Sequence, residues 1–184
     1  KNGFSDELQT FSIATAVNAT TGTPYAWTIP DAVSQTVKVR VANEADPTVG
    51  FDVSDANFKI LAALTVTAPN SGEVWTVNSG KSITWTTGGT ATNVKIEYST
   101  DGGLTYPNVI TASTANTGSY SWTVPDAITT AARVKVSHTA DADAFDTSNA
   151  NFNIRGALAL TSPNGAEQWG IATPQTVTWD VTGS

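Results

Sequence analysis

The chain contains no cysteine and no methionine, and only 14% of its 184 residues are charged. Without cysteine it can form neither disulfide bonds nor thiolate metal sites. No run approaches the roughly twenty apolar residues that a membrane-spanning helix needs. Lys and Arg are outnumbered by Asp and Glu, which leaves a net charge of −7 at pH 7. Because an acidic surface repels phosphates, we expect neither nucleic acid nor an anionic membrane as a partner.

The residues that are abundant favour β-strands. Val, Ile, Thr and aromatic side chains recur throughout, and 40% of the residues are hydrophobic, enough to build a packed core. In residues 64–157, apolar residues alternate with polar ones in short runs that Gly, Pro, Asn or Asp separate. This period of two is typical of strands with one buried face.

The sequence repeats itself at a spacing of about 94 residues. The matching pairs, all in one order, are YAWTIPDA (25–32) with YSWTVPDA (120–127), FDVSDANFKI (51–60) with FDTSNANFNI (145–154), LTVTAPNSGEVW (64–75) with LALTSPNGAEQW (158–169), and KSITW (81–85) with QTVTW (175–179). Matches in one order indicate a tandem repeat. We expect a complete repeat at 64–157, the C-terminal part of a preceding repeat at 1–63, and the N-terminal strands of a following repeat at 158–184.

Each repeat is predicted to be an immunoglobulin-like β-sandwich. About seven short strands in about 94 residues, joined by turn residues, is the pattern of that fold. The predicted fold class is all-β, with one complete sandwich and two partial ones. The joint at 154–158 contains no Pro-rich or Ser-rich spacer. Because so short a joint permits little movement, we expect a string of stiffly connected sandwiches.

A series of motifs resembles one known repeat. In order, the motifs are P-N-x-G-E-x-W, I-T-W, V-K-I-E-Y-S-T-D-G-G, T-G-S-Y-S-W-T-V-P and D-x-S-N-A-N-F-N-I. They are similar to the immunoglobulin-like domain of the Ser/Thr-rich glycosylphosphatidylinositol-anchored membrane family, shared with fungal proteins of cell-wall glucan assembly. Bacterial and archaeal secreted proteins carry similar domains in tandem. The resemblance implies the fold and an extracellular or cell-surface location, and it implies no catalytic residue.

Two motifs with carboxylates are interpreted as turns. The segment STDGGLTY (99–106) fits the Asp-box pattern of sialidase-like propellers, in which the Asp side chain bonds backbone amides and Gly supplies a positive φ. A sialidase would also need an arginine cluster, and this chain has only Arg40, Arg133 and Arg155. Glu73 and Glu167 precede tryptophans by two residues, and we expect them to bond backbone at a turn.

Three aspartates of one loop, Asp141, Asp143 and Asp146, form the candidate metal site. Clustered carboxylates suit Ca²⁺, which takes about six to eight oxygen ligands. The alternative is a solvated turn whose side chains cap their own backbone; no other cofactor is expected. His138 is the only histidine, and with no Cys or second His to share zinc it is expected on the surface at a strand end. Asn18 begins the only N-glycosylation sequon.

The six tryptophans fall at equivalent places of the repeats. Trp85 and Trp122 share the phase of Ile83 and Val124 in alternating strands, so we expect both in a core. Trp75 follows a Pro-Asn turn and could be either buried or exposed as a platform for a sugar ring. An exposed aromatic strip would favour a carbohydrate-binding module.

Both partial repeats are expected to need neighbours. Alone, each would leave unpaired strand edges and an exposed apolar face that includes Trp27, Trp169 and Trp179. Two explanations stay open: the chain is a slice of a longer covalent array, or identical copies join head-to-tail by exchanging strands. Either arrangement builds a fibre that does not close.

We therefore expect a non-enzymatic structural repeat of an extracellular filament, stalk or surface-layer-type protein. Its partners are identical copies or adjacent repeats, head-to-tail. The alternative is a carbohydrate-binding or adhesive accessory array of a secreted enzyme, with polysaccharide as the partner. An enzyme is disfavoured because no nucleophile–base pair is visible.

Overall fold

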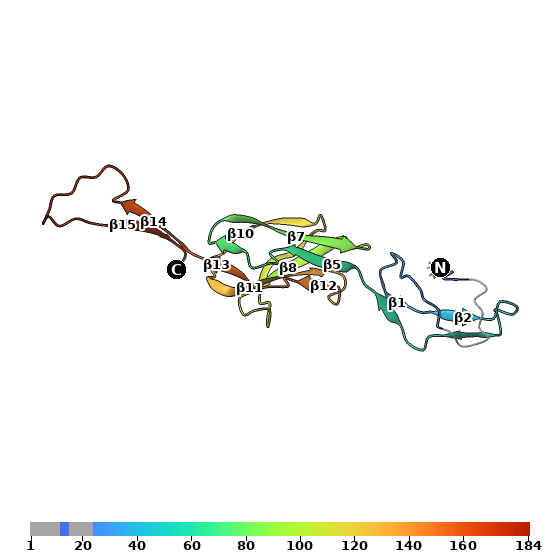
Figure 1. Cartoon of the computed structure of the whole chain (residues 1–184). Coiled ribbons are helices and arrows are strands. Elements are labelled where there is room, and N and C mark those ends of the chain that lie inside the picture. The colour runs from blue at the N-terminus through green and yellow to red at the C-terminus, as the bar shows by residue number, and fades with distance from the viewer. Residues whose placement is uncertain (1–11, 15–23) are drawn as a thin grey trace, which may run out of the picture. The chain divides into compact units, whose positions relative to one another are not determined.

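The computed structural model describes residues 12–14 and 24–184, and within these residues every regular element is a β-strand (Figure 1). The all-β class expected from the alternating sequence is therefore confirmed. The chain divides into two compact units, Lys1–Ile60 and Leu61–Ser184, which are described separately. The boundary lies a few residues before the predicted one, and residues 158–184 belong to the larger unit.

The larger unit contains two packed sheets. The first has three antiparallel strands in the order β10–β7–β5, where β5 is Ala63–Ala68, β7 is Gly80–Gly88 and β10 is Ser119–Thr123. Its sequence explains its two faces, because Ile83 and Trp85 of β7 are buried while Ser82 and Thr86 point away from the core.

The second sheet has the strand order β6–β13–β11–β8–β9, with β12 also paired to β11. The bounds are β6 Val74–Thr76, β8 Asn93–Ser99, β9 Asn108–Ala115, β11 Thr129–His138, β12 Phe145–Thr147 and β13 Phe152–Arg155. All of these pairings are antiparallel except β6–β13, which is parallel. The first and last strands of this sheet in sequence therefore lie side by side and run in the same direction.

One hydrophobic core lies between the two sheets. Its members come from both sheets: Leu64, Val66, Trp75, Val77, Ile83, Trp85, Val94, Ile96, Trp122, Val124, Ala132, Val134, Val136, Phe152 and Ile154. Trp75 packs against Trp122 and Phe152, with ring centroids 5.8 and 4.9 Å away. The apolar residues that alternate along the strands therefore form the inner faces of both sheets, which share one core.

A buried serine interrupts the last strand of this sandwich. Strand β11 pairs with β13 at one end and with β12 further along. Between β12 and β13, Ser148 is fully buried, its Oγ accepts a hydrogen bond from the Val134 N–H at 3.0 Å, and its own N–H donates to the Val134 carbonyl at 2.9 Å. The Ser148 hydroxyl therefore gives the Val134 N–H of β11 an acceptor at the point between β12 and β13 where strand pairing is interrupted.

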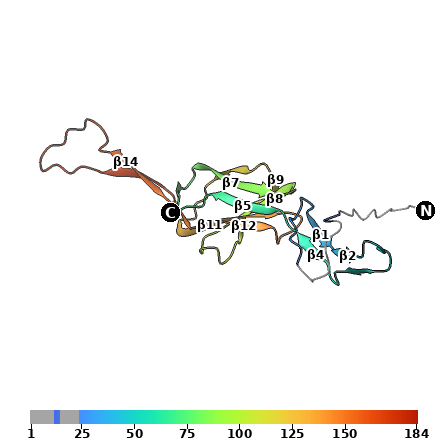
Figure 2. The ribbon, with the colours of Figure 1, turned by 45° about the vertical axis from the view of Figure 1, so that its right-hand side comes forward.

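Past the sandwich, the chain forms a two-stranded ribbon of β14 (Ala157–Ser162) and β15 (Thr178–Thr182). Only Gly156 separates β14 from Arg155 at the end of β13, so the predicted absence of a spacer is confirmed. Among the described strands, β14 and β15 pair only with each other (Figure 1 and Figure 2). We call this strand pair the C-terminal ribbon.

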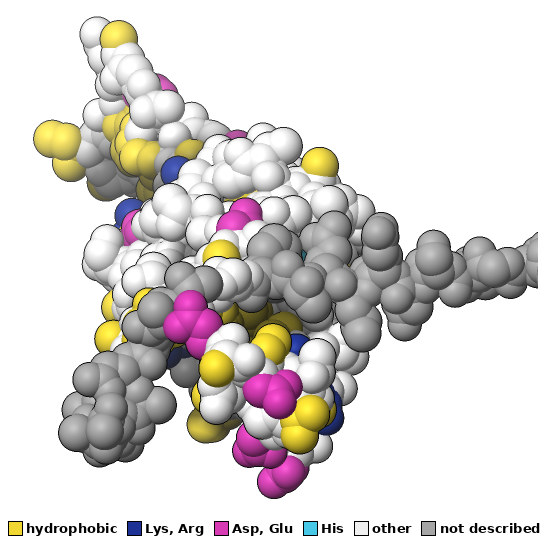
Figure 3. All heavy atoms as spheres, turned by 90° about the vertical axis from the view of Figure 1, so that its right-hand side faces the viewer, with side chains coloured by type: hydrophobic (Ala, Val, Ile, Leu, Met, Phe, Trp, Pro, Cys, Tyr) yellow, Lys and Arg dark blue, Asp and Glu magenta, His cyan; other side chains and the backbone are white. Residues whose placement is uncertain are grey.

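The smaller unit contains two strand pairs. Strand β1 (Ser34–Val37) pairs with β4 (Phe58–Ile60), and β2 (Arg40–Ala42) pairs with β3 (Phe51–Val53), both antiparallel. We call residues 24–60 the N-terminal half-sheet. On the face drawn in Figure 3, hydrophobic and acidic side chains are both exposed at several places.

Candidate functional sites

The Glu73 carboxylate organises the turn that leads into the sandwich. It accepts hydrogen bonds from the N–H groups of Asn70, at 2.8 and 3.0 Å, and Ser71, at 2.9 Å. Burial opposes ionisation of Glu73, but backbone hydrogen bonds from Ser71, Asn70 and its own amide outweigh burial, so the pKa of Glu73 is lowered. The predicted role of Glu73 as an acceptor at the turn is confirmed.

Glu167 repeats this arrangement at the second turn. It accepts from the N–H of Asn164 at 2.9 Å and of Gly165 at 2.8 Å. These hydrogen bonds, chiefly the one from Asn164, lower the pKa of Glu167. Both glutamates are therefore held as anions that fix the backbone, which is the opposite of what a general acid needs.

The Asp-box segment is likewise a structural turn. The Asp101 carboxylate accepts from the Thr105 N–H at 3.1 Å, while Ser99 Oγ donates to Asp101 and accepts from the Gly103 N–H at 2.9 Å. Hydrogen bonds from Ser99 and Thr105 strongly lower the pKa of Asp101. Gly102 and Gly103 have φ values of +80° and +89°, which a side chain would strain. The predicted geometry of this motif is confirmed.

Two of the three aspartates of the candidate calcium site accept hydrogen bonds from backbone N–H groups. Asp141 accepts a hydrogen bond from the Asp143 N–H at 3.1 Å, and Asp146 accepts one from the Val66 N–H of β5 at 2.7 Å. Within residues 12–14 and 24–184, no group of three or more His, Cys, Asp or Glu side chains is arranged to hold a metal ion. The bond from Asp143 to Asp141 is the one that a self-capping turn predicts, and the calcium site stays a prediction.

His138 corrects the sequence-based expectation. It is the last residue of β11, but it is buried and not on the surface. The backbone N–H of His138 donates to the Ala144 carbonyl at 2.8 Å, and the backbone N–H of Ala144 donates to the Asp141 carbonyl at 3.1 Å. These bonds fold the acidic loop over the histidine. Strand position alone could not show this cover, because it depends on a loop closure after the strand.

The tryptophans of the complete sandwich are core residues. Trp85 and Trp122 are buried as predicted, and Trp85 Nε1 donates to Asn116 Oδ1 at 2.6 Å. Trp75, which could have been exposed, is also buried. Tyr106 is half-buried, and burial raises its pKa. The exposed aromatic strip that would favour sugar binding is therefore not formed at Trp75.

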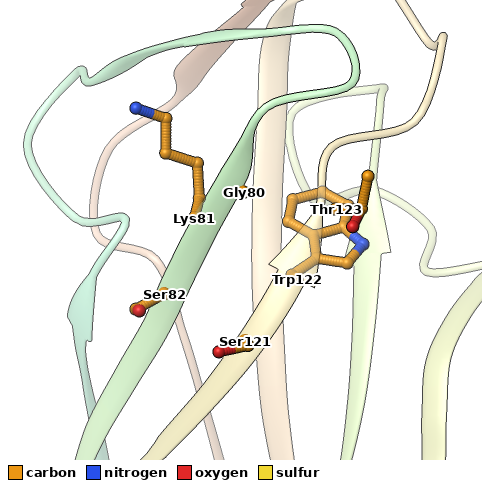
Figure 4. Close-up of a pocket in the computed structure, with 6 residues that line it drawn as sticks. All are labelled: Gly80, Lys81, Ser82, Ser121, Trp122 and Thr123. Carbon is orange, nitrogen blue, oxygen red and sulfur yellow. The ribbon is translucent and has the colours of Figure 1, made fainter.

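An open groove of about 400 Å³ lies at the edge of the three-stranded sheet, along β7 and β10 (Figure 4). Its lining consists of Gly80, Lys81, Ser82, Ser121, Trp122 and Thr123. The Trp122 ring is packed against Trp75 and against Tyr98, whose centroid is 5.2 Å away. Trp122 is buried, at 8% exposure, so it offers little of its ring to a ligand.

The C-terminal ribbon touches the sandwich through one polar contact. The Ser184 N–H donates to both Asp126 carboxylate oxygens, at 3.2 and 3.1 Å, and Ser184 Oγ lies 3.2 Å from Asp126 Oδ2. At the adjoining Gly156, a Cβ atom would lie only 2.6 Å from the Thr182 carbonyl oxygen. The joint therefore requires glycine for close backbone approach.

Two further expectations concern glycosylation and membrane-spanning helices. Asn18, the candidate glycosylation site, lies outside the described residues. Among the residues that are described, no helix is long and apolar enough to span a membrane. No protein-family model matches the chain, and no curated protein matches it.

Proposed function

We propose that this chain is a non-enzymatic structural segment of an extracellular filament, stalk or surface-layer-type protein, built from immunoglobulin-like sandwiches in tandem. One observation carries the proposal. The C-terminal ribbon has the strand register of β5–β7, but its apolar side chains are exposed. A strand pair with the register of a sandwich and no cover requires further strands to bury its face.

The joint between the sandwich and the ribbon supports a stiff array. One residue, Gly156, connects β13 to β14, and the Asp126 carboxylate binds Ser184, which follows β15 at the same end of the ribbon. Chain continuity and this second contact hold the ribbon at two points. A joint held at two points resists bending more than a flexible linker does.

The parallel pairing of β6 and β13 supports a role under tension. The Asn153 N–H donates to the Glu73 carbonyl at 2.8 Å, and the Val77 N–H donates to the Arg155 carbonyl at 3.0 Å. Because β6 is near the start of the sandwich and β13 ends it, pulling on the chain ends shears these strands along each other. Their hydrogen bonds must then break together and not one by one.

The carboxylates support a structural role as well. Glu73, Asp101 and Glu167 have lowered pKa values because they accept hydrogen bonds within turns. An extracellular location is proposed on the sequence resemblance described above, together with the absence of cysteine and the sparse charge.

The proposal is tested by extending the chain. A variant that carries a copy of residues 91–157 after Ser184 supplies the ribbon with the strands that cover β5–β7. We expect Trp169 and Trp179 to become buried, seen as a blue shift of tryptophan fluorescence, and small-angle scattering to show a rod. Ribbon tryptophans that stay exposed, or a single compact globule, would contradict the proposal.

Force spectroscopy tests the role under tension. Pulling the sandwich from its two ends should give one rupture event, followed by a length gain of about 300 Å for a repeat of this size. Val77→Pro removes the N–H that bonds Arg155 and should lower the rupture force. Val77→Ala, which keeps that N–H, is the matched control. Equal rupture forces for the two variants would show that shear of β6–β13 is not the barrier.

A further inference from the structure

We infer that the C-terminal ribbon of one copy is covered by the N-terminal half-sheet, residues 24–60, of a second copy of this chain. The inference rests on the proposed function and names its partner: a second copy joined head-to-tail in trans. The complete sandwich of the same chain serves as the template for the fit.

The ribbon reproduces the opening strands of the sandwich. Leu160 lies opposite Trp179 just as Val66 lies opposite Trp85, and Leu158 lies opposite Val181 as Leu64 lies opposite Thr87. The Thr161 and Thr178 hydroxyls are 2.8 Å apart, and those of Thr67 and Thr84 are 2.7 Å apart. The ribbon therefore already has the backbone arrangement of a covered strand pair.

The apolar side chains of the ribbon are exposed, whereas their counterparts in the sandwich are buried. Trp85 is 3% exposed and its counterpart Trp179 is 57% exposed; Leu64 is 7% exposed and its counterpart Leu158 is 74% exposed. Further exposed apolar residues of this segment are Leu160, Trp169, Ile171, Val177 and Val181. So large an apolar face is the mark of an unfilled interface.

The half-sheet reproduces the closing strands of the sandwich. The pairs Val37–Phe58 and Val41–Asp52 have the registers of Ala132–Phe152 and Val136–Asp146. Ser54 Oγ accepts from the Val39 N–H at 3.1 Å, as Ser148 Oγ does from Val134. The cation–π contact repeats too: Arg40 over Phe51 and Lys135 over Phe145, each 4.4 Å from the ring centroid.

Apolar side chains of the half-sheet are exposed among the described residues as well. Val136 is fully buried, but its counterpart Val41 is 70% exposed. Val124 is fully buried, and its counterpart Ile29 is exposed. The chain thus holds two preformed halves of a sandwich, each with an open apolar face, and each half carries the sequence that covers the other in the template.

The template specifies how the halves meet. In the sandwich, Ser121 of β10 lies opposite Ser82 of β7, and the Val66 N–H donates to Asp146. The corresponding contacts between copies place Ala26 opposite Thr176 and the Leu160 N–H on Asp52. The parallel pair Ile154–Trp75 corresponds to Ile60 beside Trp169. The β15 edge of the ribbon would then be paired, and β14 would stay at the edge of its sheet as β5 does in the template.

The joined sandwich is smaller than its template. Residues 24–60 correspond to strands β10–β13 and contain no counterpart of β8 and β9. Those strands lie together at one end of their sheet, beyond β11, so the joined sandwich keeps two facing layers and an open edge. We therefore expect association weaker than the cohesion of the complete sandwich. Because ribbon and half-sheet are different surfaces, the contact propagates into a fibre.

Single-cysteine variants test the inference, since the native chain has no cysteine. Ala26→Cys and Thr176→Cys are prepared separately, mixed as full-length chains and oxidised with glutathione disulfide. Directly opposed strand residues have Cα atoms about 4.5–5.5 Å apart, which suits a disulfide. We expect a covalent heterodimer to form at least tenfold faster than with Ala26→Cys and Asp180→Cys, the control pair about 13 Å out of register.

The outcomes separate the inference from the proposed function. A wild-type chain that sediments as a monomer at about 100 μM, a concentration at which even weak contacts of about −5.5 kcal/mol are half-formed, would overturn the inference. Equal cross-linking of both cysteine pairs, or faster Thr176→Cys homodimers, would overturn it too. If the chain extended with residues 91–157 buries its ribbon while the native chain stays monomeric, the inference fails and the tandem array stands. If neither buries the ribbon, both fail.

Discussion

The strand pairs β5–β7 and β14–β15 are built alike and placed differently. Both follow the same register, and in each the glutamate of the turn accepts N–H groups from the turn backbone. Even the unusual backbone positions recur: Asn78 and Ala172 have φ values of +62° and +65°. Yet the first pair forms half of a core, and the second is exposed on its apolar face.

The difference separates what a strand pair needs to form from what it needs to be stable. Register and turn geometry depend on contacts within about 25 residues of sequence, and both pairs contain them. Burial depends on β8, β11 and β13, which only the first pair meets. Since covering one Leu or Val side chain contributes about 1.5–3 kcal/mol, the uncovered pair lacks most of the stabilisation of the first.

The largest expected effect comes from the tryptophan of each pair. Trp85→Ala should lower the free energy of unfolding by about 3–5 kcal/mol, because it opens a cavity in a closed core. Trp179→Ala should change it by less than about 0.5 kcal/mol in dilute solution, where the ribbon is uncovered. Urea denaturation of both variants at low micromolar concentration measures the difference. Equal losses would mean that the ribbon is covered within its own chain.

The equivalent serines Ser148, which is buried, and Ser54, which is partly exposed, extend the comparison to the closing strands. Ser148→Ala leaves the Val134 N–H without its acceptor in the core and should cost about 1–3 kcal/mol. Ser54→Ala removes the matching bond to Val39 in an open half-sheet, where water can replace it, so a smaller loss is expected. Denaturation midpoints of the two alanine variants give the comparison. A larger loss for Ser54→Ala would contradict it.

The turn glutamates give a smaller, pH-dependent effect. Because folding lowers the pKa of Glu73 from 4.5, its contribution is present above about pH 4.5 and disappears as the pH falls through the folded-state pKa. Glu73→Gln should therefore cost about 0.5 kcal/mol at pH 7, after allowance for solvent screening, and almost nothing in strong acid. Thermal melts from pH 7 to pH 2 test this. A difference that grows toward acid pH would reverse the assignment.

Calcium should have the smallest effect. Asp141 and Asp146 are engaged by backbone N–H groups, and Asp146 links its loop to β5 of the covered pair. Millimolar Ca²⁺ and excess chelator should give the same melting midpoint for the sandwich. A melting midpoint that Ca²⁺ raises, and that Ca²⁺ no longer raises in Asp143→Asn, would contradict this prediction and support the calcium site.

Sequence reasoning succeeded where a pattern is local. The alternation in KSITW placed Ile83 and Trp85 in a core, and the Asp-box spacing anticipated the bonds of Asp101. Strand β9 could not be read from its sequence, because NVITASTA has no clear apolar alternation and the strand lies at the edge of its sheet with little buried surface. The sequence also left His138 on the surface, because the loop that covers it closes through backbone bonds that carry no side-chain pattern.

The sequence by itself therefore determined the strands, their turns and the likeness between distant segments, since these follow from the period of two and from short-range hydrogen bonds. Only the tertiary structure decided which of the similar strand pairs is covered. The reason is physical: a hydrogen bond within a ribbon needs only the neighbouring strand, whereas an apolar face is buried only by a second layer. Within the described residues that layer covers Trp85, whereas Trp179 is exposed.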